Sequence, residues 1–154
     1  MYRQFVHSIS LVTVFLVMAV VPAIAGNGSL PGNNGDSAAV FHNIMTRTSI
    51  RKFQQRPVEQ EKVMALLRAG MAAPTARDLR PWHFVVLNDT AAIHHYAKGM
   101  KRHGEQIAQT PLIIYACGDT TRMMQGQGRD FWIQDVSCAS KNILLAAHAL
   151  GLGA

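Results

Sequence analysis

The chain has 154 residues, the size of one domain, and leaves no room for two separate hydrophobic cores. Hydrophobic residues make up 49% of it and charged residues 16%, which is ordinary for a packed globular domain and argues against a wholly disordered chain. The formal net charge is +6, but the basic residues are scattered, whereas nucleic-acid binding would need a basic stripe with interleaved aromatic residues. We therefore expect no nucleic-acid partner, and a modest affinity for anionic small molecules fits the charge better.

Residues 1–25 have the pattern of an export signal peptide. Arg3 provides the positive start, the apolar run Ile9–Val21 follows, and Ala23 and Ala25 are small residues at the −3 and −1 positions of a peptidase site. The apolar run is shorter than the roughly 20 residues that a membrane span needs. We expect a periplasmic or secreted protein with no stable membrane association after cleavage. An uncleaved membrane anchor is the alternative.

Residues 26–36 are rich in Gly and Asn and are expected to form a flexible linker, so that the folded domain covers residues 37–154. Within it, the period of the apolar residues predicts a short amphipathic helix over residues 37–46. Residues 46–53 lose this period and are expected to form a turn followed by extended chain.

A second helix is predicted over residues 57–71, with the acidic Glu59 and Glu61 in its first turn, where the helix dipole favours negative charge. Pro74 ends this helix because its ring cannot continue the hydrogen-bond ladder. Residues 75–81 are then expected to form a loop.

The rest of the chain alternates strands and helices. Residues 82–87 predict a strand, and a helix capped by Thr90 is expected to run to about Arg102. Residues 111–117 predict a second strand, and its unbroken apolar run indicates burial on both faces. A long helix is expected over residues 129–150, with Gly151 as its C-cap. The order indicates a mixed α and β layer fold, but two strands are too few for a stable sheet, so a partner chain or further sequence would complete it.

The cysteine and histidine residues of the chain form no recognisable metal-binding motif. Cys117 and Cys138 lie in apolar segments, which favours two packed free thiols over a disulfide, although an exported protein can form one. Their spacing matches no metal motif. His94 and His95 are adjacent on a predicted helix and face apart, which favours a surface role over metal binding.

A basic segment, residues 47–53, reads Arg-Thr-Ser-Ile-Arg-Lys-Phe. In extended chain alternate side chains point the same way, so Arg47, Ser49 and Arg51 are expected on one face. Two guanidinium groups with a hydroxyl between them suit a phosphate. The alternative is a solvated basic turn, which is common on protein surfaces.

A proline-bounded loop, residues 74–81, leads into the first predicted strand. Pro74 and Pro81 constrain its entry and exit, and the loop could present backbone amides and small side chains to a flat ligand. The alternative is a plain helix-to-strand connection with Trp82 in the core.

In this order, the two segments resemble the nitroreductase family. That family has an Arg-x-Ser-x-Arg/Lys segment after its first helix, and then an Ala-Pro-Ser/Thr loop that closes on Pro-Trp and a strand. The end of the last helix, residues 146–153, also resembles the central helix of the family, so the resemblance extends from about Phe41 to Ala154. It implies an α+β fold, a three-layer α/β/α sandwich with a central mixed, mainly antiparallel sheet. The family normally continues with a strand, a loop that reaches flavin N5 and a basic segment, so we expect the fold to be incomplete at the C-terminus.

The resemblance also implies the site residues. Arg47, Thr48, Ser49 and Arg51 would bind the phosphate and ribityl chain of FMN, while Pro74, Thr75, Ala76 and Asp78 would lie against the flavin of the partner subunit, because the family builds its sites at a homodimer interface. Asp78 stands where the family usually has Asn, and a carboxylate cannot donate as an amide does. No catalytic side chain is implied, because the flavin carries the chemistry.

The expected function follows from this resemblance. The protein would be an FMN-dependent oxidoreductase that transfers hydride from NAD(P)H through FMN to nitroaromatic, quinone or related acceptors. The alternative is a non-catalytic flavin-binding or interaction remnant of the family.

Overall fold

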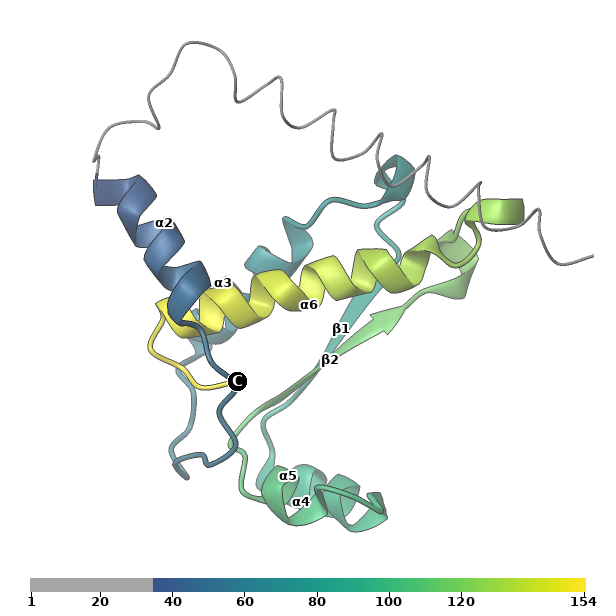
Figure 1. Cartoon of the computed structure of the whole chain (residues 1–154). Helices are drawn as coiled ribbons and strands as arrows, with labels where there is room; N and C mark the ends of the chain where they lie inside the picture. Colours follow the sequence, from purple (N-terminus) through teal and green to yellow (C-terminus); the bar gives the residue numbers. More distant parts are fainter. Residues whose placement is uncertain (1–34) are drawn as a thin grey trace, which may run out of the picture. The chain divides into compact units, whose positions relative to one another are not determined.

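The computed structural model of the protein describes residues 35–154 (Figure 1). The predicted signal peptide, residues 1–25, and almost all of the predicted linker lie outside these described residues and stay predictions. The chain divides after Phe41 into two compact units, and the second unit, from His42 to Ala154, holds the sheet and the helices that pack on it. No helix in residues 35–154 has the length and apolar character that a membrane crossing requires.

Helix α2, Gly35–Thr46, begins two residues before the predicted start and ends where predicted. None of its residues is buried, and its large apolar side chains Val40, Phe41, Ile44 and Met45 are all exposed. The helix predicted from the spacing of the apolar residues is confirmed. None of its faces is buried within residues 35–154.

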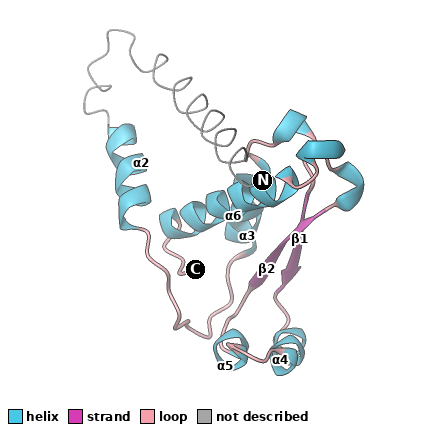
Figure 2. Ribbon diagram, turned by 45° about the vertical axis from the view of Figure 1, so that its right-hand side comes forward, coloured by secondary structure: helices cyan, strands magenta, loops and turns pink. Residues whose placement is uncertain are grey.

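The remaining elements follow one another with short connections (Figures 1 and 2). In chain order they are α3 (Gln60–Met71), the short 3₁₀ helix η1 (Ala76–Asp78), β1 (Trp82–Leu87), α4 (Thr90–Gly99), α5 (Gly104–Ala108), β2 (Ile113–Gly118), the 3₁₀ helices η2 (Thr120–Arg122) and η3 (Gly126–Gly128), and α6 (Phe131–Ala149).

The two strands form an antiparallel pair in which Trp82 lies opposite Gly118 and Leu87 lies opposite Ile113. Both were predicted, and the bounds of β1 agree residue for residue. The combination of helices with an antiparallel sheet confirms the expected α+β class.

The core lies between one face of this sheet and two helices. Leu66 of α3 packs with Ile143 and Ala147 of α6, and Phe84 of β1 and Ile114 of β2 add their side chains from the sheet. Figure 2 shows α6 and α3 side by side next to the strands. Because alternate strand residues point to opposite faces, this packing uses one face of each strand.

Helix α6 supplies a stripe of buried side chains, Asp135, Ala139, Ile143 and Ala147, which recur every four residues. After this helix Gly151 takes a φ of 72°, a conformation that glycine adopts without a side-chain clash. The turn bonds Gly151 N to the carbonyl of His148 at 3.0 Å and Leu152 N to that of Ala147 at 2.8 Å. This is the Schellman arrangement, and it confirms the predicted glycine C-cap.

Several predicted helix boundaries were wrong. Helix α3 begins at Gln60, so Glu59 precedes the helix and is not in its first turn. The cap of α4 is Asp89, not Thr90, because the Asp89 carboxylate accepts a hydrogen bond from Ala92 N at 2.7 Å. Helix α4 ends at Gly99, and the separate short helix α5 was not predicted.

The burial predicted for the second strand and for both thiols was also wrong. β2 is half-buried along most of its length, and Cys117 is exposed on its outer face. Cys138 is exposed because it is offset by about 100° around α6 from the buried stripe that contains Ala139, and the same helix leaves Ile133 exposed. Both cysteines are free thiols, as favoured from the sequence.

The close approach of β2 to α6 predicts one stability effect. A Cβ atom added at Gly118 would overlap the ring of Trp132, so Gly118→Ala is expected to lower the free energy of unfolding by about 1–3 kcal/mol through overpacking. The matched control is Gly99→Ala, where an added Cβ meets no atom within 4 Å. Urea unfolding followed by circular dichroism measures both variants, and equal midpoints would contradict the packing described here.

Candidate functional site

The basic segment follows α2 and lies in chain that has neither helix nor strand between residues 47 and 59, as the sequence predicted for its first part. The end of α2, directly before this segment, is attached to the C-terminal half of α6. Asn43 Nδ2 donates to the carbonyl of Leu145 at 3.0 Å, and Thr46 Oγ1 lies 2.9 Å from His148 Nε2. These two contacts hold the start of the basic segment beside the end of α6.

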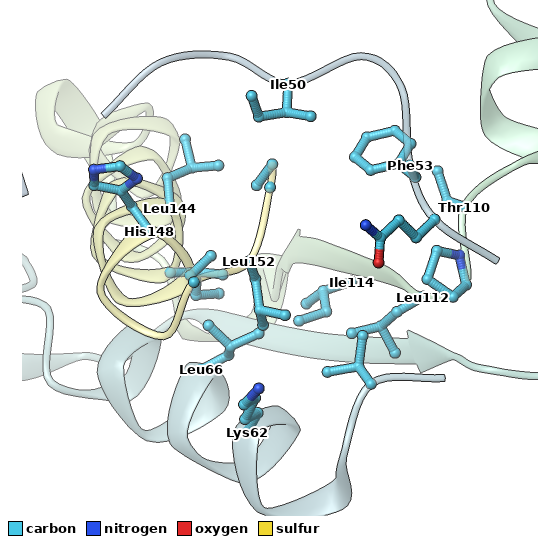
Figure 3. Close-up of a pocket in the computed structure, with 18 of the residues that line it drawn as sticks. Ile50, Phe53, Lys62, Leu66, Thr110, Leu112, Ile114, Leu144, His148 and Leu152 are labelled. Carbon is cyan, nitrogen blue, oxygen red and sulfur yellow. The ribbon is translucent and has the colours of Figure 1, made fainter. Parts of the chain in front are cut away.

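The basic segment forms one wall of a cavity of about 740 Å³ (Figure 3). Leu66, Ile114 and Leu144 line it from α3, β2 and α6, and Ile50 and Phe53 close it from the segment itself. The backbone also takes part, because Ile50 N donates to the carbonyl of Ala154 at 3.0 Å. Arg47, Lys52 and Lys62 are among the lining residues, so a largely apolar cavity has basic groups at its margin.

The side chains of the segment divide between the cavity and the outside. Thr48, Ile50 and Lys52 line the cavity, whereas Ser49 and Arg51 are exposed and are not among its lining residues. This alternation is typical of extended chain. Arg47, at the start of the segment, is half-buried and lines the cavity. The prediction that Arg47, Ser49 and Arg51 project from one face was therefore wrong, because only Arg47 of the three lines the cavity.

The hydrogen-bond donors of the segment are largely uncommitted. Among residues 35–154, no side-chain acceptor or carboxylate bonds the guanidinium of Arg47 or the hydroxyls of Thr48 and Ser49. Arg51 donates only to the carbonyl of its neighbour Ile50, through Nη1 at 3.0 Å. Two guanidinium groups and two hydroxyls with free donors are chemically suited to an anion such as a phosphate.

The proline-bounded loop is attached to the other end of α6. Ala76 N, in η1, donates to Asp135 Oδ1 at 2.9 Å, and Asp135 is the buried acidic residue of the α6 stripe. The sequence analysis did not identify Asp135. The signal was present, because an acidic residue sits four positions before Ala139 on a face that is otherwise apolar.

Inside the loop, Asp78 and Arg80 form a two-pronged ion pair. Arg80 Nε donates to Asp78 Oδ1 at 2.7 Å and Arg80 Nη2 donates to Asp78 Oδ2 at 3.0 Å. The hydrogen bond from Arg80 holds the pKa of the Asp78 carboxyl below its ordinary value, and the same pair raises the pKa of Arg80. Asp78 is therefore ionised and paired within the loop, and Thr75 Oγ1 adds an acceptor for Arg80 N at 3.2 Å.

The backbone of this loop is unusual. Arg77, Asp78 and Arg80 have φ values of 53°, 55° and 49°, in the left-handed region that residues with a side chain seldom adopt. Of the predicted ligand-facing residues, Pro74 and Asp78 are exposed and Thr75 and Ala76 are half-buried.

The two candidate segments lie far apart in one chain. Their anchors on α6 are Asp135 for the loop and His148 for the basic segment, which are separated by about 20 Å of helix axis. The structure therefore does not bring the two sets of predicted residues together within a single chain.

The described part of the chain holds no group of three or more His, Cys, Asp or Glu side chains that could bind a metal ion. His94 and His95 are both exposed on α4, and His94 Nε2 lies 3.2 Å from the carbonyl of Ala108.

Comparison with known proteins finds one family that the chain resembles. Residues 44–109 match the nitroreductase family. A candidate NADH dehydrogenase/NAD(P)H nitroreductase of Methanothermobacter thermautotrophicus is 42% identical over 116 residues, which cover 75% of this chain and 58% of that protein. The chain thus spans about three fifths of the length of this relative.

Solved structures agree in fold. A crystal structure of a candidate NADH dehydrogenase/NAD(P)H nitroreductase from Parabacteroides distasonis is 42% identical, with a TM-score of 0.66 over 74% of this chain and 64% of that one. An FMN-dependent nitroreductase from Clostridium difficile is 34% identical, with a TM-score of 0.65 over 73% of this chain and 62% of that one. The described fold is thus that of nitroreductases, and the chain is similar in sequence to members of the nitroreductase family.

Proposed function

We propose that the protein is an FMN-dependent oxidoreductase of nitroreductase type, which takes reducing equivalents from NAD(P)H and passes them to small acceptors such as nitroaromatics or quinones. Bound FMN would supply the hydride chemistry, and the protein would bind and orient it. The observation that carries the proposal is the uncommitted, half-buried Arg47 within a segment that matches the family.

The donor set of the basic segment fits the phosphate of FMN. An Arg guanidinium binds a phosphate through two parallel hydrogen bonds, and Arg47 has no competing carboxylate among the described residues. Thr48, which lines the cavity with Arg47, would add a hydroxyl donor. Ser49 and Arg51 lie outside the cavity and would have to turn toward the phosphate, and Arg51 would also exchange its bond to the carbonyl of Ile50.

The loop would meet the flavin of a second subunit. A flavin mononucleotide whose phosphate lies at the basic segment would have to extend along much of α6 to reach the loop of the same chain, because the two anchors are about 20 Å apart. In a homodimer, the loop of one subunit can approach the basic segment of the other. The exposed apolar side chains of α2, including Phe41 and Ile44, supply surface that such a dimer could bury.

In this arrangement, Asp135 would act by holding the loop in shape. Its carboxylate fixes Ala76 N, while the pair of Asp78 with Arg80 fixes the next turn of the loop. Since both oxygens of Asp78 are already bonded to Arg80, the flavin contact expected from an Asn at this position would fall to backbone groups of the loop.

The first test is flavin retention. The purified chain is incubated with FMN and passed through a desalting column, and its visible spectrum and NAD(P)H oxidation are then measured. Retained flavin with NAD(P)H-dependent reduction of a quinone is the expected result. Retained flavin without turnover would favour a non-catalytic flavin-binding protein, and a folded sample without flavin would contradict the proposal.

A second prediction concerns the phosphate contact. Arg47→Ala is expected to weaken FMN binding by about 1.5–3 kcal/mol, the usual contribution of a charge-assisted hydrogen bond. Arg102→Ala, at an exposed Arg outside both segments, is the matched control and should bind FMN as the parent chain does. Fluorescence titration of FMN measures both affinities, and an unchanged affinity in the Arg47 variant would remove the assignment.

A third prediction tests the shared site. Arg47→Ala removes the phosphate contact and Pro74→Glu sets a charge against the flavin ring, so each variant alone should retain little FMN. If each site uses the basic segment of one subunit and the loop of the other, a hybrid dimer has one intact site. Unfolding and refolding the variants together at equal amounts should then restore about one quarter of the parental flavin content, since half of randomly formed dimers are hybrids. No recovery would mean that both segments serve a site within one chain.

A further inference from the structure

The proline-bounded loop is held in shape by hydrogen bonds on both sides of Arg77. Directly before it, Ala76 N donates to the buried Asp135 of α6 at 2.9 Å. Directly after it, Asp78 N donates to the carbonyl of Thr75 at 3.1 Å. Both carboxylate oxygens of Asp78, the one acidic residue of the loop, accept hydrogen bonds from Arg80. The loop is therefore a fixed frame whose carboxylate is already engaged.

Arg77 is the basic residue of this frame that has no partner. It is exposed, and within the described part of the chain no carboxylate or carbonyl bonds to its guanidinium. The other basic residue of the loop, Arg80, is taken up by its ion pair with Asp78. The loop thus presents one uncommitted positive charge, and that charge stands between two anchored residues.

The backbone at Arg77 supports a use for this side chain. Its φ of 53° and ψ of 25° lie in the left-handed region, which glycine adopts freely and residues with a Cβ atom seldom adopt. Residues held in such conformations cluster at sites that clamp a ligand. A glycine at this position would remove the strain but would carry no charge, so the strain and the free guanidinium together point to a ligand for Arg77.

We propose that Arg77 selects acceptors that carry an anionic group, a carboxylate or a sulfonate, on the quinone or nitroaromatic ring. This inference rests on the proposed function, in which the loop lies against the flavin and therefore beside the acceptor. A guanidinium binds such a group through two parallel hydrogen bonds. Arg77 is a specificity-determining residue, because it binds a part of the acceptor that does not react.

Neither of the other basic groups of the two candidate segments can take this role. The Nε and Nη2 atoms of Arg80 are bonded to Asp78. Arg47 is assigned to the phosphate of FMN. The preference for an anionic acceptor should therefore depend on one side chain, which makes it open to a single substitution.

The first experiment compares acceptors that differ in charge. The FMN-loaded full chain is assayed with naphthoquinone sulfonate against naphthoquinone, and with nitrobenzoate against nitrobenzyl alcohol. Arg77→Gln keeps a side chain of similar length without the charge. It should lower kcat/KM for the anionic member of each pair at least about tenfold, mainly through KM, and leave the neutral member within about twofold. Arg102→Ala, the control used above, should change neither.

A second experiment measures binding and stability without turnover. Arg77→Gly removes the guanidinium and also the left-handed strain, so its urea midpoint should rise while its affinity for nitrobenzoate falls. Nitrobenzoate binding is followed by the change in the flavin spectrum of the oxidised, FMN-loaded chain. Arg77→Lys keeps the charge and should restore part of this affinity. A variant that is more stable and yet binds the anion less well separates the role of the guanidinium from general loosening of the fold.

The outcomes that would overturn the inference are distinct from those that would overturn the proposed function. An equal loss for charged and neutral acceptors in Arg77→Gln would mean that Arg77 only supports the loop, and no loss for either would mean that it takes no part. In both cases FMN-dependent turnover of the neutral acceptors would leave the proposed function intact. A folded chain that retains no FMN would overturn the proposed function and this inference together.

Discussion

The packing of α6 against α3 and the sheet is the interaction on which the rest of the second unit depends. A single stripe on α6, repeating every four residues, supplies Ile143 and Ala147 to the core and Asp135 to the loop. The same helix, through Leu145 and His148, holds the start of the basic segment. Because one rigid helix carries both attachments, the distance between the two candidate segments is set by its length and not by flexible connections.

Much of the fold could be predicted from local pattern. The strand at residues 82–87 is an apolar run bounded by Pro81 and by Asn88-Asp89, and the glycine after α6 is a standard helix end, so both were predicted correctly. The wrong predictions concern which faces of each element are buried. The local sequence does not distinguish a strand that is buried on both faces from β2, which is covered on one face only. It also does not show that Cys138 lies just outside the buried stripe of α6. The five-residue helix α5 is too short to show a period.

The candidate site could be predicted in part for the same reason. The basic segment and the loop are continuous in sequence and were found. Asp135 was not predicted because its partner Ala76 is 59 residues away in the sequence. In the sequence alone, a carboxylate on the apolar face of a helix only interrupts that face, and its hydrogen bond to the loop amide is seen only in the structure. The pairing of Asp78 with Arg80 was also not anticipated, although it decides that this carboxylate is already engaged inside the loop.

The left-handed residues of the loop have a thermodynamic consequence. Holding a residue with a side chain in that region costs about 1–2 kcal/mol, and Arg77, Asp78 and Arg80 all do so. In the folded chain, the hydrogen bond from Ala76 N to Asp135 and the ion pair of Asp78 with Arg80 offset this conformational free energy before any ligand binds. A ligand that docked there would meet a backbone already held in this conformation, so that association would require less ordering of the loop.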